Sequence, residues 1–334
     1  MAIRIITILV VVLLATWSGY WLIASHAQRK ALDALATELR SAGKSLTYET
    51  LSVRGFPNRF DMTIHQPVYI DPVLNLRWQA EFVQLLSLSY QSNNMIIAWP
   101  PIQQIQINDQ QFDLLTEKMR TSLSFDSISD LQLDTAITES AELTLSNAPA
   151  WQIHFGDFLV ALRRSLESDQ QVEFAIRARH LPGSFAAQPE SWLESLMADL
   201  ASVEFSVAVD FDGPVPANPC AADSPAIKRI VVQDSQLRWQ DGMLALNGDL
   251  ALTNDKLSGF ATIETDETGF STLAAKVPKT PEPLPFSRDE IALAALALDF
   301  FMSGPATLQF ENGWIVYQDR FLIPLPPLQL CPEG

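Results

Sequence analysis

The sequence is poor in the residues from which most catalytic and metal centres are built. Among its 334 residues there are two cysteines and four histidines, and charged residues make up only 18%, below the usual quarter. Two cysteines are too few for a disulfide-rich miniprotein or a four-cysteine zinc module. Basic residues are scarce as well, since 22 lysines and arginines stand against 39 acidic residues, giving a net charge of −17. Such a field repels phosphate backbones, so we expect no nucleic-acid partner.

No motif of a known catalytic or cofactor site is present. The four histidines, His26, His65, His154 and His180, are scattered without the spacing of metal ligands. There is no phosphate-binding loop, dinucleotide-binding glycine pattern, nucleophile elbow or His-Glu-x-x-His sequence. We therefore predict no catalytic residue, no metal and no cofactor, and expect the protein not to be an enzyme. A hydrolase built on paired carboxylates is the less favoured alternative, because such pairs are recognised in space and not by sequence spacing.

What the sequence does contain is a long apolar run at its amino-terminal end. Ile5 to Ala24 carries no charge, and its outer end holds Trp17, Tyr20 and Trp21. About 20 helical residues span a hydrocarbon core of roughly 30 Å, and aromatic side chains favour the membrane interface. We therefore predict that residues 1–26 form an uncleaved transmembrane signal anchor. A cleaved signal peptide is the competing reading, because Ser25-His26-Ala27 fits a small-x-small cleavage site.

After the apolar run, the pattern is first helical and then period two. Ala31, Leu32, Leu35, Ala36 and Leu39 predict a helix over residues 27–42, which ends at Gly43 and lays its apolar stripe on a sheet. Beyond Lys44, alternating apolar residues predict antiparallel strands with one wet face. The clearest rows are Val203, Phe205 and Val207, and then Leu244, Leu246 and Leu250.

Two dipeptides and three short apolar segments complete the predicted elements. Asp241-Gly242 and Asn312-Gly313 are typical of two-residue hairpin turns. Short apolar segments predict further helices over residues 158–166, 192–200 and 291–301. The predicted fold class is α+β and β-rich, with an amino-terminal transmembrane helix, antiparallel sheets and a few packed helices.

Proline and cysteine positions suggest how the chain is divided. Residues 213–225 carry four prolines and predict a linker between a β-rich half with a stalk helix, residues 27–212, and a second β-rich half, residues 226–334. Cys220 and Cys331 lie in proline-rich, loop-like settings. They form either a disulfide that ties the tail to the linker or two unrelated thiols, and the sequence leaves both open.

The most distinctive short motif is Gly55-Phe56-Pro57 followed by Arg59-Phe60. Glycine permits a tight turn and proline fixes φ, so the motif predicts a turn between two strands that Phe56 and Phe60 anchor in the core. Arg59 is expected to pair with an acidic side chain or to reach a lipid headgroup.

This motif, after a membrane anchor, resembles the bacterial envelope family known as domain of unknown function 2125. Trp239-Gln240-Asp241-Gly242-x-Leu244-x-Leu246-x-Gly248-x-Leu250 resembles the same family and repeats of AsmA-like envelope proteins, and Phe310-Glu311-Asn312-Gly313 with Pro324 and Leu325 continues the likeness. The resemblance supplies no catalytic residues. The AsmA likeness implies a curved sheet with an apolar groove and a part in lipid homeostasis.

Together these features favour a non-enzymatic envelope protein, anchored by one helix in the bacterial inner membrane with its body in the periplasm. Positive residues stand on both sides of the apolar run, namely Arg4 before it and Arg29, Lys30 and Arg40 after it, so charge alone does not fix the orientation. The expected partners are the membrane and a lipid, which the two rows Val203/Phe205/Val207 and Leu244/Leu246/Leu250 are expected to bind. The alternative is a structural scaffold that contacts another envelope protein.

Overall fold

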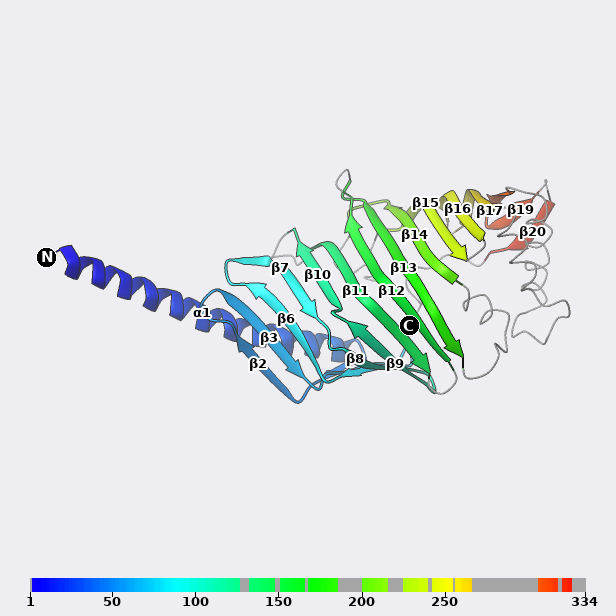
Figure 1. Cartoon of the computed structure of the whole chain (residues 1–334). Coiled ribbons are helices and arrows are strands. Elements are labelled where there is room, and N and C mark those ends of the chain that lie inside the picture. Colours follow the sequence, from blue (N-terminus) through cyan, green and yellow to red (C-terminus); the bar gives the residue numbers. More distant parts are fainter. Residues whose placement is uncertain are drawn as a thin grey trace.

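A computed structural model of the chain describes residues 2–126, 132–147, 151–165, 168–185, 200–215, 225–239, 242–254, 256–265, 306–317 and 320–325. In these ranges one long helix, α1, precedes twenty strands that join into a single curved antiparallel sheet (Figure 1). The predicted β-rich fold class with an apolar amino-terminal helix is therefore confirmed. The helix is α1 (Ala2–Ser41), and the strands are β1 (Ser45–Thr47), β2 (Thr50–Arg54), β3 (Arg59–His65), β4 (Val68–Asp71), β5 (Leu76–Ala80), β6 (Phe82–Leu88), β7 (Gln91–Ala98), β8 (Ile102–Ile107), β9 (Gln110–Glu117), β10 (Arg120–Phe125), β11 (Leu133–Asn147), β12 (Trp151–Arg164), β13 (Gln171–Phe185), β14 (Leu200–Phe211), β15 (Ile227–Trp239), β16 (Gly242–Thr253), β17 (Lys256–Thr265), β18 (Ala306–Glu311), β19 (Trp314–Tyr317) and β20 (Arg320–Pro324).

Helix α1 has two different halves. Its amino-terminal part projects away from the sheet (Figure 1) and exposes its apolar side chains, and the helix as a whole is long and apolar enough to cross a membrane. Thr7 and Thr16 lie inside the apolar run, and each donates its hydroxyl to the carbonyl four residues earlier, so neither is left unpaired there.

The second half of α1 packs on the sheet, as the helical spacing predicted. Leu32 is buried against Met62 and Ile64 of β3, and the partly buried Leu51 and Leu85 join this core. The cluster places α1 on one face of β2, β3 and β6, and the helix passes behind these strands in Figure 1.

The helix ends at Gly43, as predicted. Gly43 has φ +75°, a left-handed conformation that glycine adopts without a Cβ penalty. The Lys44 amide donates to the Leu39 carbonyl (2.9 Å) and the Gly43 amide to the Arg40 carbonyl (3.1 Å). These two bonds form a Schellman motif, which turns the chain from α1 into β1.

The sheet divides into two arms at β11. Residues 133–139 of β11 pair with β10, and residues 142–146 pair with β9. One arm then runs through β10, β7, β6, β3 and β2, and the other through β9, β8, β5, β4 and β1. Since Leu46 of β1 packs on the same cluster as Met62 of β3, both arms reach the end of α1.

Beyond β11 the sheet continues as one layer from β12 to β20. Strands β14 and β15, which flank the predicted linker, pair directly, so one sheet crosses this position. Residues 216–224 of that linker lie outside the described residues.

One of the two hairpins predicted from dipeptides has the expected turn. Asn312 and Gly313 both have positive φ, 50° and 82°, and lie between the paired residues Glu311 and Trp314, as a type I′ turn requires. The prediction that Gly242 is a turn residue of the other hairpin is wrong, because Trp239 of β15 pairs with Gly242, which is the first residue of β16. Asp241 lies outside the described residues.

The prediction of a helix over residues 158–166 is wrong. Residues 158–164 belong to strand β12, which is paired with β11 on one edge and β13 on the other. The misreading has a physical cause: Phe158 to Leu162 is apolar at every position, and a short unbroken apolar run fits a buried helix and a strand equally well. The predicted helix over residues 192–200 lies outside the described residues except for Leu200, which begins β14, and the one over 291–301 lies wholly outside them.

Candidate functional site

The family-like motif forms the turn between β2 and β3, as predicted. The Arg59 amide donates to the Gly55 carbonyl at 2.9 Å and closes the turn. Gly55 has φ +104°, and a Cβ at this position would lie 2.9 Å from both the Cβ and the carbonyl oxygen of Arg59. Only glycine fits here without displacement of the chain.

This turn is where α1 joins the sheet. Trp17 donates its indole N–H to the Pro57 carbonyl (2.8 Å), and Trp21 donates to the Arg59 carbonyl (2.9 Å). Tyr20 donates its hydroxyl to the carbonyl of Ser89, which follows β6 (2.8 Å). The three aromatic residues therefore satisfy turn carbonyls that would otherwise need water. We call these residues and the two turns that they bind the junction.

Ring packing reinforces these bonds. Trp21 stacks on Phe60 with ring centroids 5.7 Å apart and meets Phe56 edge to face, also at 5.7 Å. Phe60 is 3% exposed, as expected for a core anchor. The expectation that Phe56 is a core anchor is wrong, because this ring contacts Trp21 and is still 55% exposed. Arg59 takes the first of its two expected partners, with a guanidinium nitrogen 3.0 Å from Asp61 Oδ1.

An apolar row starts at Phe60 and crosses the sheet. Residues paired directly opposite each other point to the same face, so the register can be followed from strand to strand. The row runs without interruption from β3 to β18 through Phe60, Ser87, Met95, Leu123, Ala136, Leu162, Phe174, Val207, Val232, Gly248, Ala261 and Leu308. We call this the apolar row and the face that carries it the inner face. Phe60, Met62 and Ile64 are every second residue of β3 and therefore point to the same face. Leu32 of α1 packs on Met62 and Ile64, so α1 lies on the inner face.

The apolar row spans a considerable distance. Its twelve strands are separated by eleven steps, and neighbouring strands lie about 4.8 Å apart. Leu308 is therefore about 50 Å from Phe60 along the sheet. Only Ser87 and Gly248 of the twelve lack an apolar side chain.

Most of the predicted ligand residues meet on the inner face beside this row. Val203, Phe205, Leu244 and Leu246 line a hollow of about 270 Å³, together with Leu237. A β-bulge between β14 and β15 lies at this point, where the register shifts between Glu204 and Val207. The other two predicted residues also lie on the inner face: Val207 belongs to the apolar row, and Leu250 pairs with Ile230 without lining the hollow.

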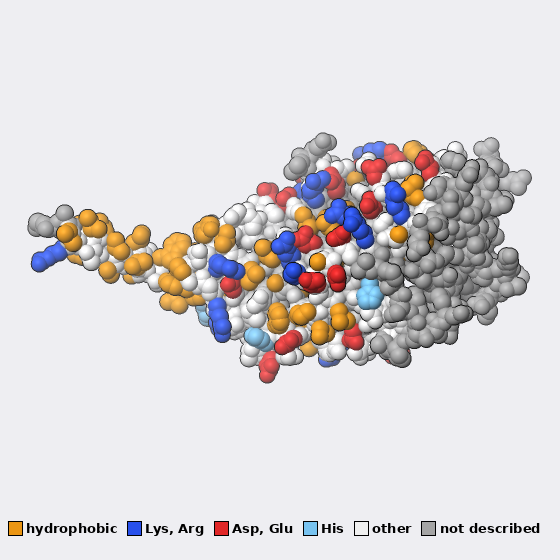
Figure 2. Space-filling model, viewed as in Figure 1, with side chains coloured by type: hydrophobic (Ala, Val, Ile, Leu, Met, Phe, Trp, Pro, Cys, Tyr) orange, Lys and Arg blue, Asp and Glu red, His pale blue; other side chains and the backbone are white. Residues whose placement is uncertain are grey.

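The opposite, outer face carries charged pairs. Blue and red side chains gather over the middle strands in Figure 2. Arg120 pairs with Glu139 across β10 and β11, and Arg163 pairs with Glu173 across β12 and β13. A hollow of about 880 Å³ on this face is lined by both signs of charge, from residues such as Arg120, Glu139 and Asp157. The two faces of the sheet thus differ sharply in polarity.

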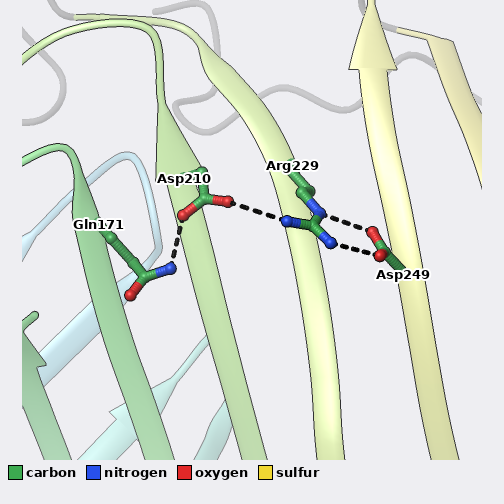
Figure 3. A network of polar contacts seen from close by, with 4 residues as sticks. All are labelled: Gln171, Asp210, Arg229 and Asp249. Carbon is green, nitrogen blue, oxygen red and sulfur yellow. Dashed lines mark hydrogen bonds and ion pairs between the residues drawn. The ribbon is translucent and has the colours of Figure 1, made fainter. Parts of the chain in front are cut away.

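One of these outer-face networks crosses four strands (Figure 3). Gln171 donates to Asp210 at 2.7 Å, and Arg229 Nε donates to Asp249 Oδ1 at 2.7 Å, with Asp210 4.0 Å from the same guanidinium. The hydrogen bond from Arg229 lowers the pKa of the Asp249 carboxyl. These residues are partly exposed, so we assign the network to strand pairing on a wet face.

Among the described residues, Asp71 is the most deeply buried carboxylate. Asp71, at the end of β4, is 1% exposed and lies 3.0 Å from Lys44 Nζ. The hydrogen bond from Lys44 is the largest cause that lowers the pKa of Asp71, and the amides of Leu74 and Val73 act in the same direction. Lys44 directly follows Gly43, so this pair fastens the carboxyl end of α1 to the sheet.

The described residues offer no metal centre, because no three or more of their His, Cys, Asp or Glu side chains come together. His154 is held between Thr144 and Gln152, at 2.8 and 2.9 Å. Cys220 and Cys331 lie outside the described residues, so their predicted pairing remains a prediction.

The contact between the two parts of the junction is not predicted by the sequence. The sequence indicates the aromatic residues of α1 and the Gly-Phe-Pro turn separately, but no pattern indicates that they bind each other. Ser89 and the exposed Tyr90 beside it carried no signal, because a single polar residue after a strand is common.

Comparison with known proteins yields one match. A family described as "Uncharacterized protein conserved in bacteria (DUF2125)" matches residues 21–316, from Trp21 of the junction to Val316 of β19. No curated protein and no solved structure matches the chain. The likeness to AsmA-like repeats therefore remains an expectation from the motif.

Proposed function

The chain belongs to the DUF2125 family of uncharacterised bacterial proteins, and we propose that it is a membrane-anchored, non-enzymatic envelope protein whose sheet carries lipid acyl chains. In this proposal α1 stays in the inner membrane and the body lies in the periplasm. The observation that carries the proposal is the apolar row, which begins at Phe60, beneath the ring of Trp21, where α1 meets the sheet.

The packing of α1 supports an anchor that is retained and not cleaved. Cleavage after Ala27 would remove Trp17, Tyr20 and Trp21, and with them three hydrogen bonds to the turns. Ser25, within the candidate cleavage site, is 8% exposed. A peptidase would have to cut a continuous helix at a packed position. The family match begins at residue 21, before that site.

The difference between the two faces supports lipid as the ligand. Acyl chains need a long, narrow and dry surface, and burial of each methylene contributes about 0.8 kcal/mol. The inner face provides a row about 50 Å long, while the paired charges are on the outer face. The hollow beside Phe205 and Leu246 is lined largely by apolar side chains and lies well along the row.

Photo-crosslinking far from the membrane tests the proposal. A photoreactive amino acid in place of Leu246 stands nine strand steps from β3, about 43 Å along the sheet, beyond the reach of lipids in the bilayer. The full chain is expressed, irradiated in cells and extracted with organic solvent. Phospholipid attached at position 246 is the expected result.

A matched variant gives the control. Val231 lies on β15 and pairs with Asp249, so it is on the outer face. The same photoreactive group at position 231 should capture no lipid. If position 246 also captures none while the protein is folded in the membrane, lipid carriage is refuted; a reproducible protein crosslink at that position would favour the scaffold alternative.

A further inference from the structure

The free part of α1 is too short to cross a bilayer alone. The junction holds Trp17, Tyr20 and Trp21 against the turns of the sheet, which leaves Ile3 to Thr16 free of the body. The uncharged part of this segment, Ile5 to Thr16, spans about 18 Å at 1.5 Å per residue, against a hydrocarbon core of roughly 30 Å. The core is matched only if it extends to the level of Ile23, because Ile5 to Ile23 spans about 29 Å.

The side chains beyond the junction fit this longer span. Leu22 and Ile23 lie at and past the level of Trp21, yet they are 63% and 75% exposed. Exposure of two such large apolar side chains to water is unfavourable, whereas their exposure to lipid is favourable. The hydrocarbon of the bilayer therefore extends to the level of the junction.

The two turns at the junction present the same kind of surface. Phe56 on the β2–β3 turn is 55% exposed, and Tyr90 on the β6–β7 turn is 68% exposed. The turns are joined, since the Ser89 amide donates to the Asn58 carbonyl at 3.0 Å. Neither turn contains an acidic residue between Gly55 and Asn58 or between Ser89 and Asn94, in a chain with 39 of them.

Basic side chains stand just behind this surface. Arg54 and Arg59 flank the β2–β3 turn and are exposed, and Arg59 is also paired with Asp61. Aromatic side chains at the interface with arginines toward the water are the usual arrangement at a membrane boundary.

We propose that the surface formed by Leu22 and Ile23 of α1 together with Phe56 and Tyr90 of the two turns is inserted into the outer part of the bilayer that α1 crosses. We call these four residues the membrane-facing surface. The inference rests on the proposed retention of α1 in the membrane. It deepens the proposed function, because the apolar row then begins at the depth of the lipid and not above the headgroups.

Spin-label accessibility measures this depth directly. Single cysteines replace Phe56, Tyr90, Phe260 or Val10 in full-length protein whose Cys220 and Cys331 are changed to serine. Each is labelled with a nitroxide in vesicles of phosphatidylethanolamine and phosphatidylglycerol. Phe260 of β17 is the matched control, because it is an equally large apolar side chain that is 49% exposed, far from the junction (Figure 1). Val10 reports the middle of α1.

We expect labels at positions 56 and 90 to favour collision with oxygen over a water-soluble nickel complex, at a depth of about 5–10 Å. The label at position 260 should favour the nickel complex. If positions 56 and 90 behave like position 260 while position 10 lies in hydrocarbon, the insertion is refuted and the anchor stands. If position 10 is also in water, the anchor itself fails, and the insertion with it.

Hydrogen exchange of the unmodified chain provides a second test that no substitution can disturb. In lipid nanodiscs, the amides of Gly55, Phe56 and Asn58 and of residues 89–91 should exchange more slowly than the amide of Asp109 in the β8–β9 turn. Equal exchange in the two regions would overturn the proposal.

Discussion

Trp21 stacks on Phe60 and donates its indole N–H to the carbonyl of Arg59, the residue before Phe60. One side chain thus connects the helix to the first residue of the apolar row by both a ring contact and a hydrogen bond. It is 8% exposed although it stands only a few residues from the fully exposed part of α1. Trp21 therefore helps to fix the position of α1 relative to the sheet through two different interactions.

Removal of the Trp21 side chain should loosen the whole junction. We expect Trp21→Ala to lower the free energy of unfolding by about 3–5 kcal/mol, as for other buried aromatic side chains. Trp21→Phe keeps the stacking and loses the hydrogen bond, so it should cost only about 0.5–1.5 kcal/mol. Circular dichroism of the strand signal against denaturant, in detergent, measures both. Equal losses from the two variants would contradict the division between ring and hydrogen bond.

Two glycines with positive φ give a matched pair for the turn. At Gly43 no atom lies within 4 Å of an added Cβ, whereas at Gly55 the Arg59 backbone is 2.9 Å away. Gly43→Ala should therefore cost only the left-handed conformation, about 1–2 kcal/mol. Gly55→Ala should cost more, because Arg59 must move and its carbonyl accepts from Trp21.

Protease sensitivity separates these two variants by location as well as by size. Limited proteolysis should cut near residues 55–60 in Gly55→Ala and not in Gly43→Ala. If Gly43→Ala proves the more damaging variant, the close approach at Gly55 does not have the importance we assign to it.

Acid should weaken the attachment of the carboxyl end of α1 through Asp71. Its pKa is lowered in the folded protein, chiefly by the hydrogen bond from Lys44, so the folded state binds a proton less readily than the unfolded chain. The stabilisation is therefore complete above the ordinary carboxyl pKa near pH 4 and is lost as the pH falls below it. The raised pKa of Lys44 acts only at alkaline pH, where its contribution is lost as the lysine deprotonates.

The Asp71→Asn variant tests this assignment. The wild-type denaturation midpoint should fall more steeply than that of Asp71→Asn between pH 5 and pH 3. Asp109→Asn, in an exposed turn, is the control and should follow the wild type. Parallel pH profiles for wild type and Asp71→Asn would show that another group controls the acid response.

Much of the fold was predictable because period-two alternation is a local property. This alternation predicts the strands around Val203 to Val207 and Leu244 to Leu250. The backbone preferences of glycine and asparagine likewise predict the end of α1 at Gly43 and the β18–β19 turn at Asn312-Gly313. β12 was not identified, because its apolar run from Phe158 to Leu162 lacks alternation and only its two neighbours decide that it is a strand.

The candidate site depends on pairings that no local pattern contains. The junction brings residues 17–21 together with residues 55–60 and with Ser89. The apolar row needs the register of eleven strand pairs, and a shift of one residue in any of them would move part of it to the other face. The division of the sheet at β11 is equally non-local. The parts of the site can therefore be predicted from the sequence, but their arrangement cannot.

If lipid moves along the apolar row, an obstacle in its middle should separate its two ends. Leu162 of β12 belongs to the row, and Leu159 of the same strand pairs with Arg177 on the outer face. An arginine in hydrocarbon costs about 2.5–3.5 kcal/mol, so Leu162→Arg should reduce lipid crosslinking at position 246 at least tenfold. Crosslinking at Met95, on the junction side, should persist. Leu159→Arg should change neither position, and both variants are compared at equal folded amounts in the membrane. A loss at both positions would indicate that Leu162→Arg damages the sheet as a whole, and unchanged crosslinking at position 246 would mean that lipid reaches the far end by some route other than the row.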